Sequence, residues 1–337
     1  MLIGICGGIC AGKNTVAQYL IAHHGFTRLA ISPDVDMIAE EAETVFHTAI
    51  DLINYVTPRW QERWVTTDVT TAADLNALQV RPFFTLISID APVALRWRRH
   101  QARLAETTDL SALSSRAQSL DAFVQESDAQ LYGATTDLQS LISRASMRLL
   151  NTSSSVANLY ATLAKLNLTS ADRLRPSWDL YFMSLAALAA QRSNCMKRRV
   201  GCVLVGREKR VVSTGYNGTP RGLQNCGDGG CPRCNTGGTG SGAALSTCLC
   251  LHAEENALLE AGRERIREGA VLYCDTCPCL TCSIKICQVG IKEVVYNQGY
   301  HMDQEAAAIF REAGVELRQF VPPPNGLIDL EKLELNF

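Results

Sequence analysis

The sequence predicts an α/β protein built from two domains. The chain has 337 residues, enough for two hydrophobic cores. Short apolar runs alternate with stretches of helical periodicity in both halves, as expected of strands separated by helices. All but two of the 14 cysteines lie between Cys195 and Cys287, so the halves differ in composition. We interpret residues 1–150 as a parallel α/β domain, 151–172 as a helical connector and 173–337 as a second α/β domain.

The first domain begins with an apolar strand over residues 1–5, followed by a glycine-rich turn and a helix over 14–23. Residues 83–90 form a second predicted strand. Helical periodicity then runs through residues 120–150. From 151 to 170 the chain is rich in Ser, Thr and Asn with leucines at helical spacing, which indicates the connector.

The second domain is predicted to start with a helix over 179–191 and two strands, 200–205 and 211–216. An insertion rich in cysteine and glycine follows, over residues 218–247. The remaining predicted elements, in chain order, are a helix 253–261, a strand 270–274, a helix 280–289, a strand 293–297, a helix 304–313 and a strand 315–320.

Charge and hydropathy exclude several classes of protein. The formal net charge is −2, without the basic excess of a protein that grips a nucleic-acid backbone. The first residues lack the basic region of a signal peptide, and no uninterrupted apolar run reaches the ~18 residues that span a bilayer. We therefore expect a protein of the cytoplasm, with the nucleus as the alternative compartment, and no membrane or nucleic-acid polymer as a partner.

Two short motifs carry the chemistry: His252-Ala253-Glu254 and Pro278-Cys279-Leu280-Thr281-Cys282. One imidazole and two thiolates supply three zinc ligands and leave the fourth position open for water, as in catalytic zinc sites. Glu254 lies beside the metal without being needed as a ligand, so it can carry protons. This pattern is a known signature of zinc nucleobase deaminases. The alternative is a closed zinc knuckle completed by another cysteine, which Pro278 and Glu254 disfavour.

Three stretches of the chain resemble the deoxycytidylate deaminase family: residues 195–201, the Gly-Tyr-Asn-Gly-Thr-Pro turn at 215–220, and 252–257. The resemblance covers about residues 175–320. It implies a cytidine-deaminase-like α/β/α sandwich with a five-stranded mixed sheet. It also implies hydrolysis of dCMP to dUMP and ammonia, supplying dUMP for dTMP synthesis.

The same resemblance implies that Gly215, Tyr216, Asn217 and Gly218 contact substrate or effector nucleotide. Taken alone, this sequence is also typical of a tight turn at a strand end. Many family members are homohexamers, activated by dCTP and inhibited by dTTP. We therefore expect a homo-oligomer with these effectors, and Mg²⁺ only together with a triphosphate.

The insertion contains more thiols than one catalytic site can use. A glycine-rich loop has little apolar content with which to order itself, and a structural zinc contributes on the order of 10 kcal/mol in small peptides. Some members of the resembled family hold a second zinc here. Free thiols are the alternative, and the choice of four ligands stays open among Cys195, Cys226, Cys231, Cys234, Cys248 and Cys250.

Near the N-terminus, residues 7–14 match the P-loop pattern G-x-x-x-x-G-K-[ST] except at Asn14. Gly7, Gly12 and Lys13 are candidate phosphate-binding residues, but the hydroxyl that would bind Mg²⁺ is replaced. The segment from Asp90 that contains Arg96 and Arg99 resembles the strand-to-lid region of P-loop nucleotide and dephospho-coenzyme A kinases. Its alternative is an amphipathic helix with a solvated basic face. We interpret the domain as P-loop NTPase-like and degenerate, an extension that fungal deoxycytidylate deaminases carry.

Two other functions remain open at this point. One is deamination of another base, such as a tRNA adenosine or a riboflavin-pathway pyrimidine, which the charge and the 215–220 turn disfavour. The other is a nucleotide sensor or bifunctional protein acting through the N-terminal domain. Glu254 argues against a purely binding role for the second domain.

Overall fold

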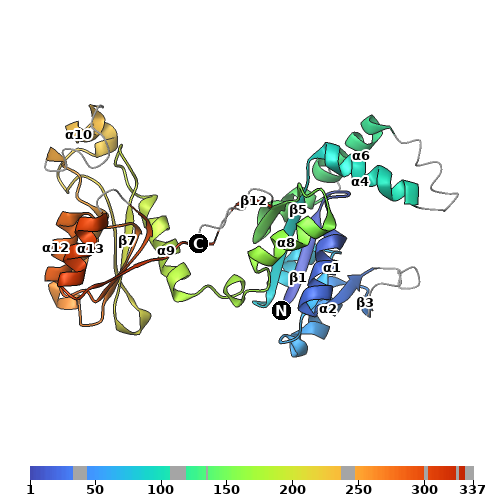
Figure 1. Cartoon of the computed structure of the whole chain (residues 1–337), viewed down its shortest axis with the longest axis horizontal. Coiled ribbons are helices and arrows are strands. Elements are labelled where there is room, and N and C mark those ends of the chain that lie inside the picture. Colours follow the sequence, from blue (N-terminus) through green and yellow to red (C-terminus); the bar gives the residue numbers. More distant parts are fainter. Residues whose placement is uncertain are drawn as a thin grey trace. The chain divides into compact units, whose positions relative to one another are not determined.

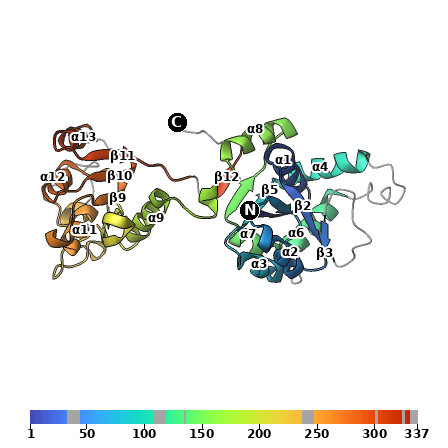
Figure 2. The same cartoon turned by 90° about the horizontal axis from the view of Figure 1, so that it is seen from below.

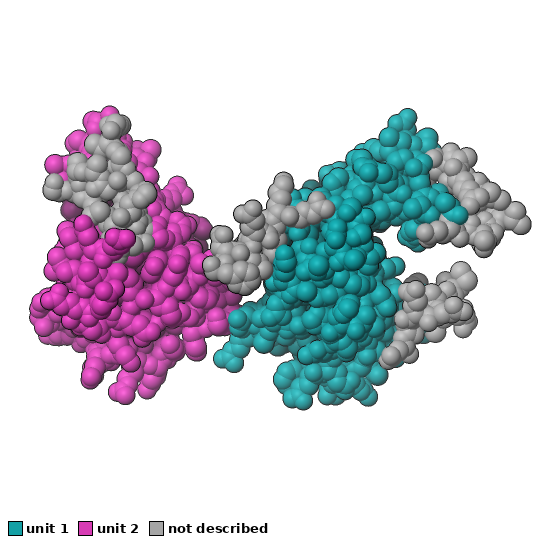
Figure 3. Space-filling view, in the orientation of Figure 1, with its two compact units in different colours: residues 1–175, 324–337 teal, residues 176–323 magenta. Residues whose placement is uncertain are grey.

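A computed structural model describes residues 1–32, 44–106, 119–133, 136–236, 247–299, 303–323 and 326–330. The chain divides into two compact units (Figure 3). Unit 1 comprises Met1–Arg175 together with Pro324–Phe337, and unit 2 comprises Pro176–Pro323.

Unit 1 is built on a seven-stranded sheet in the order β12-β6-β5-β1-β4-β2-β3. Figure 1 shows β1, β3, β5 and β12 of this sheet. Every strand pair described in it is parallel, as predicted. The strands are β1 (Leu2–Gly7), β2 (Thr27–Ile31), β3 (Thr44–Phe46), β4 (Trp64–Thr66), β5 (Phe84–Asp90), β6 (Met147–Leu150) and β12 (Leu327–Asp329).

Helices cover both faces of this sheet. The side chains of β1 point alternately to the two faces and so contribute to two separate cores. Ile3 and Ile5 pack with residues of α1 and α8, whereas Leu2 and Cys6 pack with residues of α2, α3 and α7. The helices of unit 1 are α1 (Lys13–His24), α2 (Ala49–Val56), α3 (Ala72–Gln79), α4 (Val93–Glu106), α6 (Leu120–Tyr132), α7 (Leu138–Arg144) and α8 (Val156–Leu166).

Three sequence-based assignments in this unit need correction. The run 120–150 is not one helical stretch, since it contains α6, α7 and the strand β6, which pairs with β5. The connector is not a linker, because Leu159, Leu163 and Leu166 of α8 belong to the unit 1 core. The second domain does not extend to residue 337, because β12 pairs with β6 in the first sheet.

Unit 2 contains the expected five-stranded mixed sheet, in the order β11-β10-β9-β7-β8. Figure 2 shows β9, β10 and β11 of this sheet. β7 is antiparallel to both β8 and β9, and the other pairs are parallel. The strands are β7 (Gly201–Val205), β8 (Val211–Tyr216), β9 (Val271–Thr276), β10 (Glu293–Gln298) and β11 (Glu316–Gln319).

The sheet of unit 2 lies between two helical layers, which makes the unit an α/β/α sandwich. Phe182 and Met183 of α9 pack on one face, and residues of α11, α12 and α13 pack on the other. The helices are α9 (Trp178–Ala190), the short α10 (Pro232–Asn235), α11 (Ala253–Ala261), α12 (Leu280–Gln288) and α13 (Asp303–Glu312). In the described part of the chain, no helix has the length and apolar character needed to cross a membrane.

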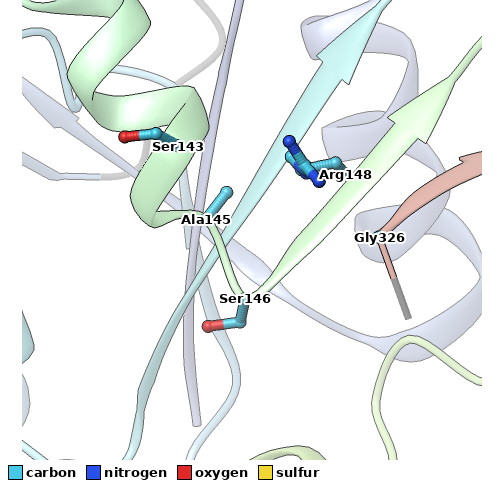
Figure 4. A pocket seen from close by; sticks show the side chains of 5 residues that line it. All are labelled: Ser143, Ala145, Ser146, Arg148 and Gly326. Carbon is cyan, nitrogen blue, oxygen red and sulfur yellow. The ribbon is translucent and has the colours of Figure 1, made fainter. Parts of the chain in front are cut away.

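A pocket in unit 1 lies where β6 and β12 begin, lined by Ser143, Ala145, Ser146, Arg148 and Gly326 (Figure 4). Ligands of open parallel α/β sheets bind outside the carboxyl ends of the strands. This pocket is at the amino ends, away from the glycine-rich turn that follows β1. It therefore does not support a nucleotide site.

Candidate active site

His252, Cys279 and Cys282, hereafter the His-Cys-Cys cluster, come together at the N-termini of two helices. His252 is the N-cap residue of α11 and Cys279 that of α12, while Cys282 lies in the first turn of α12. Both sulfurs are 3.3 Å from Nδ1 of His252. The predicted ligands therefore meet at one point, where two helix N-termini favour an anionic ligand set.

The cluster has the donor set and spacing of a zinc site. Zn–S bonds of about 2.3 Å and Zn–N bonds of about 2.0 Å in a tetrahedron separate nitrogen from sulfur by roughly 3.5 Å. The 3.3 Å separations are close to that value. Cys279 and Cys282 are buried, and the three ligand atoms form one of the possible metal-binding groups among the described residues. The residues present thus fit zinc, with a fourth position left for a small molecule.

The electrostatics of the cluster favour the ionised form of one sulfur, that of Cys279. The hydrogen bond with Cys282 lowers the pKa of Cys279 to about 3, while the same contact raises the pKa of Cys282 because the pair shares one proton. The hydrogen bond to Cys279 likewise raises the pKa of His252. A divalent cation bound here would displace these protons, since thiolate and neutral imidazole are the metal-binding forms.

Glu254 lies in the first turn of α11 and is 4% exposed. Burial raises its pKa to about 7, although the charge of His252 opposes this shift. A zinc ion beside it would oppose the shift further by attraction. A carboxyl group with a pKa near neutrality can both accept and donate a proton, which is the property that a proton carrier requires.

Two residues that sequence reasoning missed hold His252 in place. Oε2 of Glu255 accepts a hydrogen bond of 2.9 Å from the backbone N–H of His252, closing a capping box at the start of α11. Lys285 of α12 forms an ion pair with Oε1 of Glu255, so the two ligand-bearing helices are joined. The available signal was the glutamate three residues after the N-cap position.

The 215–218 turn is tied into the protein more tightly than its expected nucleotide contacts suggested. Oδ1 of Asn217 accepts hydrogen bonds from the hydroxyl of Ser193 (2.7 Å) and the N–H of Val200 (2.8 Å). Nδ2 of Asn217 donates to the carbonyl of Arg198 at 2.8 Å. The buried Asn217 side chain therefore positions the segment before β7, while Tyr216 is 37% exposed at the end of β8.

Gly215 sets how closely α11 approaches the sheet. A Cβ atom at this position would lie 2.1 Å from the carbonyl oxygen of Ala253 and 2.5 Å from the nitrogen of Ala257. Only glycine permits this approach. Because α11 starts at His252, Gly215 influences the positions of both His252 and Glu254.

All six candidate cysteines of the insertion gather into a single cluster beside α10, hereafter the six-cysteine cluster. The structure groups their sulfurs as Cys195, Cys226, Cys234 and Cys250, and again as Cys231, Cys234, Cys248 and Cys250. In each group the ligand atoms lie within 4.8 Å of one another. Residues 237–246 of the insertion lie outside the described residues.

The glycine-rich turn of unit 1 connects β1 to α1 and requires glycine at Gly12, whose φ is 110° and whose Cβ would lie 2.6 Å from Nδ2 of Asn151. The guanidinium of Arg99 contacts this turn, in contrast to the alternative of a solvated basic face. It donates hydrogen bonds to the carbonyls of Cys10 and Ala11 at 3.4 and 3.3 Å. The N–H of Ile9 donates to Gln130 at 3.1 Å. Protein groups thus already occupy part of the loop.

Arg96, the other arginine of this segment, is 5% exposed and donates to the hydroxyl of Ser127 at 2.7 Å. Lys13, which follows the glycine-rich turn, is also partly buried, and this burial lowers its pKa. The basic face of α4 is therefore partly directed toward the turn rather than into water.

Comparisons with known proteins show the family of the chain. Residues 176–298 match the family model of the cytidine and deoxycytidylate deaminase zinc-binding region. The chain is 48% identical to the deoxycytidylate deaminase of Schizosaccharomyces pombe, over 96% of this chain and 99% of that protein. It is 43% identical to the enzyme of the same name from Saccharomyces cerevisiae, over 95% of this chain and 96% of that protein. Among solved structures, the dCMP deaminase of cyanophage S-TIM5 in complex with dCMP and dUMP is 30% identical over 42% of this chain and 94% of that one, with a TM-score of 0.34.

Proposed function

This chain belongs to the deoxycytidylate deaminase family, and we propose that it hydrolyses dCMP to dUMP and ammonia at the His-Cys-Cys cluster, with Glu254 as the proton carrier. The observation that carries the proposal is the buried carboxyl group of Glu254, placed at the start of the same helix that presents His252. The similarity to a curated relative extends over both units, since it covers 96% of the chain, whereas the family model matches residues 176–298 of unit 2.

The residues of the site divide the work of the reaction. His252, Cys279 and Cys282 would hold zinc, which when bound supplies an activated water by lowering its pKa toward ~7. The carboxylate of Glu254 would carry one proton of the attacking water to N3 of the cytosine ring as the water oxygen bonds to C4. It would then carry the second proton to the amino group as the C4–N bond breaks and ammonia leaves, so the atoms of dCMP and water balance those of dUMP and ammonia.

The test is Glu254→Gln in the full chain, with Glu260→Gln as the control. Glu260 lies on the same helix with its side chain exposed. The amide cannot carry a proton, so we expect zinc content and thermal unfolding to be unchanged and turnover of dCMP to fall by about 10²–10⁴-fold. Retention of more than about a tenth of the activity would exclude Glu254 from this role. A substrate panel with cytidine, tRNA and riboflavin-pathway pyrimidines tests the alternative substrates on the wild type.

We further propose that the six-cysteine cluster holds structural zinc, that the enzyme is a hexamer and that dCTP and dTTP regulate it, with Mg²⁺ entering only with a triphosphate. The 215–218 turn is the proposed nucleotide contact, through backbone groups and Tyr216, because the Asn217 side chain is already bonded within the protein. Mass measurement with and without dCTP tests assembly, and activity at fixed dCMP tests both effectors.

For unit 1 we propose a P-loop kinase-like domain that binds a phosphate-bearing ligand without transferring a phosphoryl group. Support comes from the glycine-dependent turn between β1 and α1, and from Asn14 in the place of the Mg²⁺-binding hydroxyl. Incubation of the wild type with ATP-Mg²⁺ and a panel of nucleosides and nucleotides tests this: formation of any phosphorylated product would make the chain bifunctional.

A further inference from the structure

The six-cysteine cluster contains two overlapping four-sulfur sites. Cys234 and Cys250 belong to both groups, while Cys195 and Cys226 belong only to the first, and Cys231 and Cys248 only to the second. We propose that the cluster binds two zinc ions bridged by the thiolates of Cys234 and Cys250. This deepens the structural zinc proposed above and raises the expected zinc content of the chain to three ions.

The distances between sulfurs match the edges of zinc–thiolate tetrahedra. With Zn–S bonds of about 2.3 Å, neighbouring sulfurs of one tetrahedron are roughly 3.8 Å apart. Sγ of Cys234 lies 3.9 Å from that of Cys195 and 3.8 Å from that of Cys248, and Cys231 lies 3.9 Å from Cys248. A disulfide would require about 2.05 Å, and all six cysteines are free.

The contacts of Cys234 are those that a bridging ligand would make. It is near Cys195, from the first group, and near Cys248, from the second, at nearly the same distance. A single tetrahedral zinc uses four thiolates and would leave two of the six without a metal. Two ions with two shared thiolates use all six, at four ligands per ion.

The surroundings supply donors for an anionic cluster. Two Zn²⁺ ions and six thiolates carry a net charge of −2, by the sum of +4 and −6. The N–H of Met196 donates to Cys226 at 3.4 Å, and that of Leu249 donates to Cys231 at 3.4 Å. The guanidinium of Arg233 donates to Cys248 at 3.5 Å. Such contacts stabilise metal-bound thiolates and are the usual outer shell of such a site.

The cluster is connected to the catalytic residues through short backbone paths. Cys250 precedes His252 by two residues, and the intervening Leu251 exchanges two hydrogen bonds with Gly218, of 2.9 and 3.1 Å. The N–H of Cys195 donates to the hydroxyl of Ser193, the same hydroxyl that holds Asn217. Filling the cluster therefore orders the 215–218 turn and the approach to α11 together.

Zinc counting on intact protein tests the proposal. Native mass spectrometry and elemental analysis of the wild type should give three zinc ions per chain. Cys279→Ser keeps all six cysteines of the cluster and should give two, while losing deaminase activity. Counts of two and one, respectively, would mean a single ion in the cluster and would overturn the proposal. These counts are independent of whether dCMP is the substrate, so the proposed reaction can fail without affecting them.

Bridging is tested separately by replacing zinc with ¹¹³Cd. Two of the three cadmium resonances should show scalar coupling to each other through the shared thiolates, and both should persist in Cys279→Ser. Two uncoupled resonances would exclude bridging. Cys234→Ser should remove both cluster ions and raise KM for dCMP, whereas Cys287→Ser, outside the cluster, should retain three ions. If one of the two cluster ions keeps its wild-type affinity in Cys234→Ser, Cys234 is not a bridge.

Discussion

Gly215→Ala should damage the active site by moving α11, although residue 215 lies in another element. The new Cβ would lie 2.1 Å from the carbonyl oxygen of Ala253, where a carbon–oxygen contact normally needs about 3.3 Å. The two nearest atoms, the carbonyl oxygen of Ala253 and the nitrogen of Ala257, both belong to the backbone, so the clash cannot be relieved by rotating a side chain. The start of α11, with His252 and Glu254, must therefore shift by roughly 1 Å.

The expected magnitude follows from that displacement. A 1 Å misplacement of catalytic groups costs on the order of 10²-fold in rate. Overpacking a core contact costs about 1–3 kcal/mol in the free energy of unfolding. We therefore expect kcat for dCMP to fall about 10²-fold and the affinity of the His-Cys-Cys cluster for zinc to decrease, in a protein that still folds.

The assay combines steady-state kinetics on dCMP, zinc titration against a chelator, and chemical denaturation. Thr214→Ala is the control, because Thr214 is the exposed neighbour on the same strand. Unchanged kcat and zinc affinity would refute the packing argument. A rise in KM alone, with kcat and zinc affinity unchanged, would instead assign Gly215 to nucleotide contact.

Two further predictions concern stability and unit 1. Arg318→Met should lower the free energy of unfolding of unit 2 by about 1 kcal/mol, because Arg318 forms an ion pair with Asp179 at 2.8 Å. The side chain of Arg318 is 37% exposed, so screening by water limits the stabilisation that this ion pair contributes. Chemical denaturation measures the effect, with Arg311→Met as the control. Burial raises the pKa of Asp179, but the hydrogen bonds from Arg318 more than offset this and leave the pKa below its usual value. The stabilisation is therefore present at neutral pH and is lost as the pH falls through that lowered pKa. The free energies of unfolding of wild type and variant should then converge in acid. A difference between them that stays constant down to pH 2 would contradict the ion pair. Lys13→Ala should leave the dCMP deamination rate nearly unchanged, because the whole His-Cys-Cys cluster belongs to unit 2; a severalfold loss of activity would show that unit 1 contributes to catalysis.

The local motifs of the active site are readable from the sequence because their geometry is local. Cys279 and Cys282 are one helical turn apart, so any helix that starts at this point places both sulfurs on the same side. His252 and Glu254 are likewise placed by one local feature, because His252 is the N-cap residue of α11 and Glu254 lies in the first turn of the same helix. Apolar periodicity is also local, and it correctly predicts β7 to β11 and the helices α9, α11, α12 and α13.

Tertiary structure decides what depends on contacts between distant residues. The strand β12 joins β6 across a separation of about 180 residues, and no local pattern specifies that pairing. Arg96 and Arg99 resemble a solvated basic face in sequence, yet the fold places carbonyls and a hydroxyl against them.

For the cysteines of the insertion, too, the sequence predicts one part of the site and the tertiary structure decides the other. Their spacing predicts a metal site, but which sulfurs approach one another depends on how α10 and the segments before β7 and α11 come together. Only that arrangement places Cys234 and Cys250 in both four-sulfur groups. The chemistry of the ligands can therefore be read from the sequence, whereas their grouping depends on the fold, because the segments that carry Cys195, Cys226–Cys234 and Cys248–Cys250 are separated in the chain and meet only through tertiary packing.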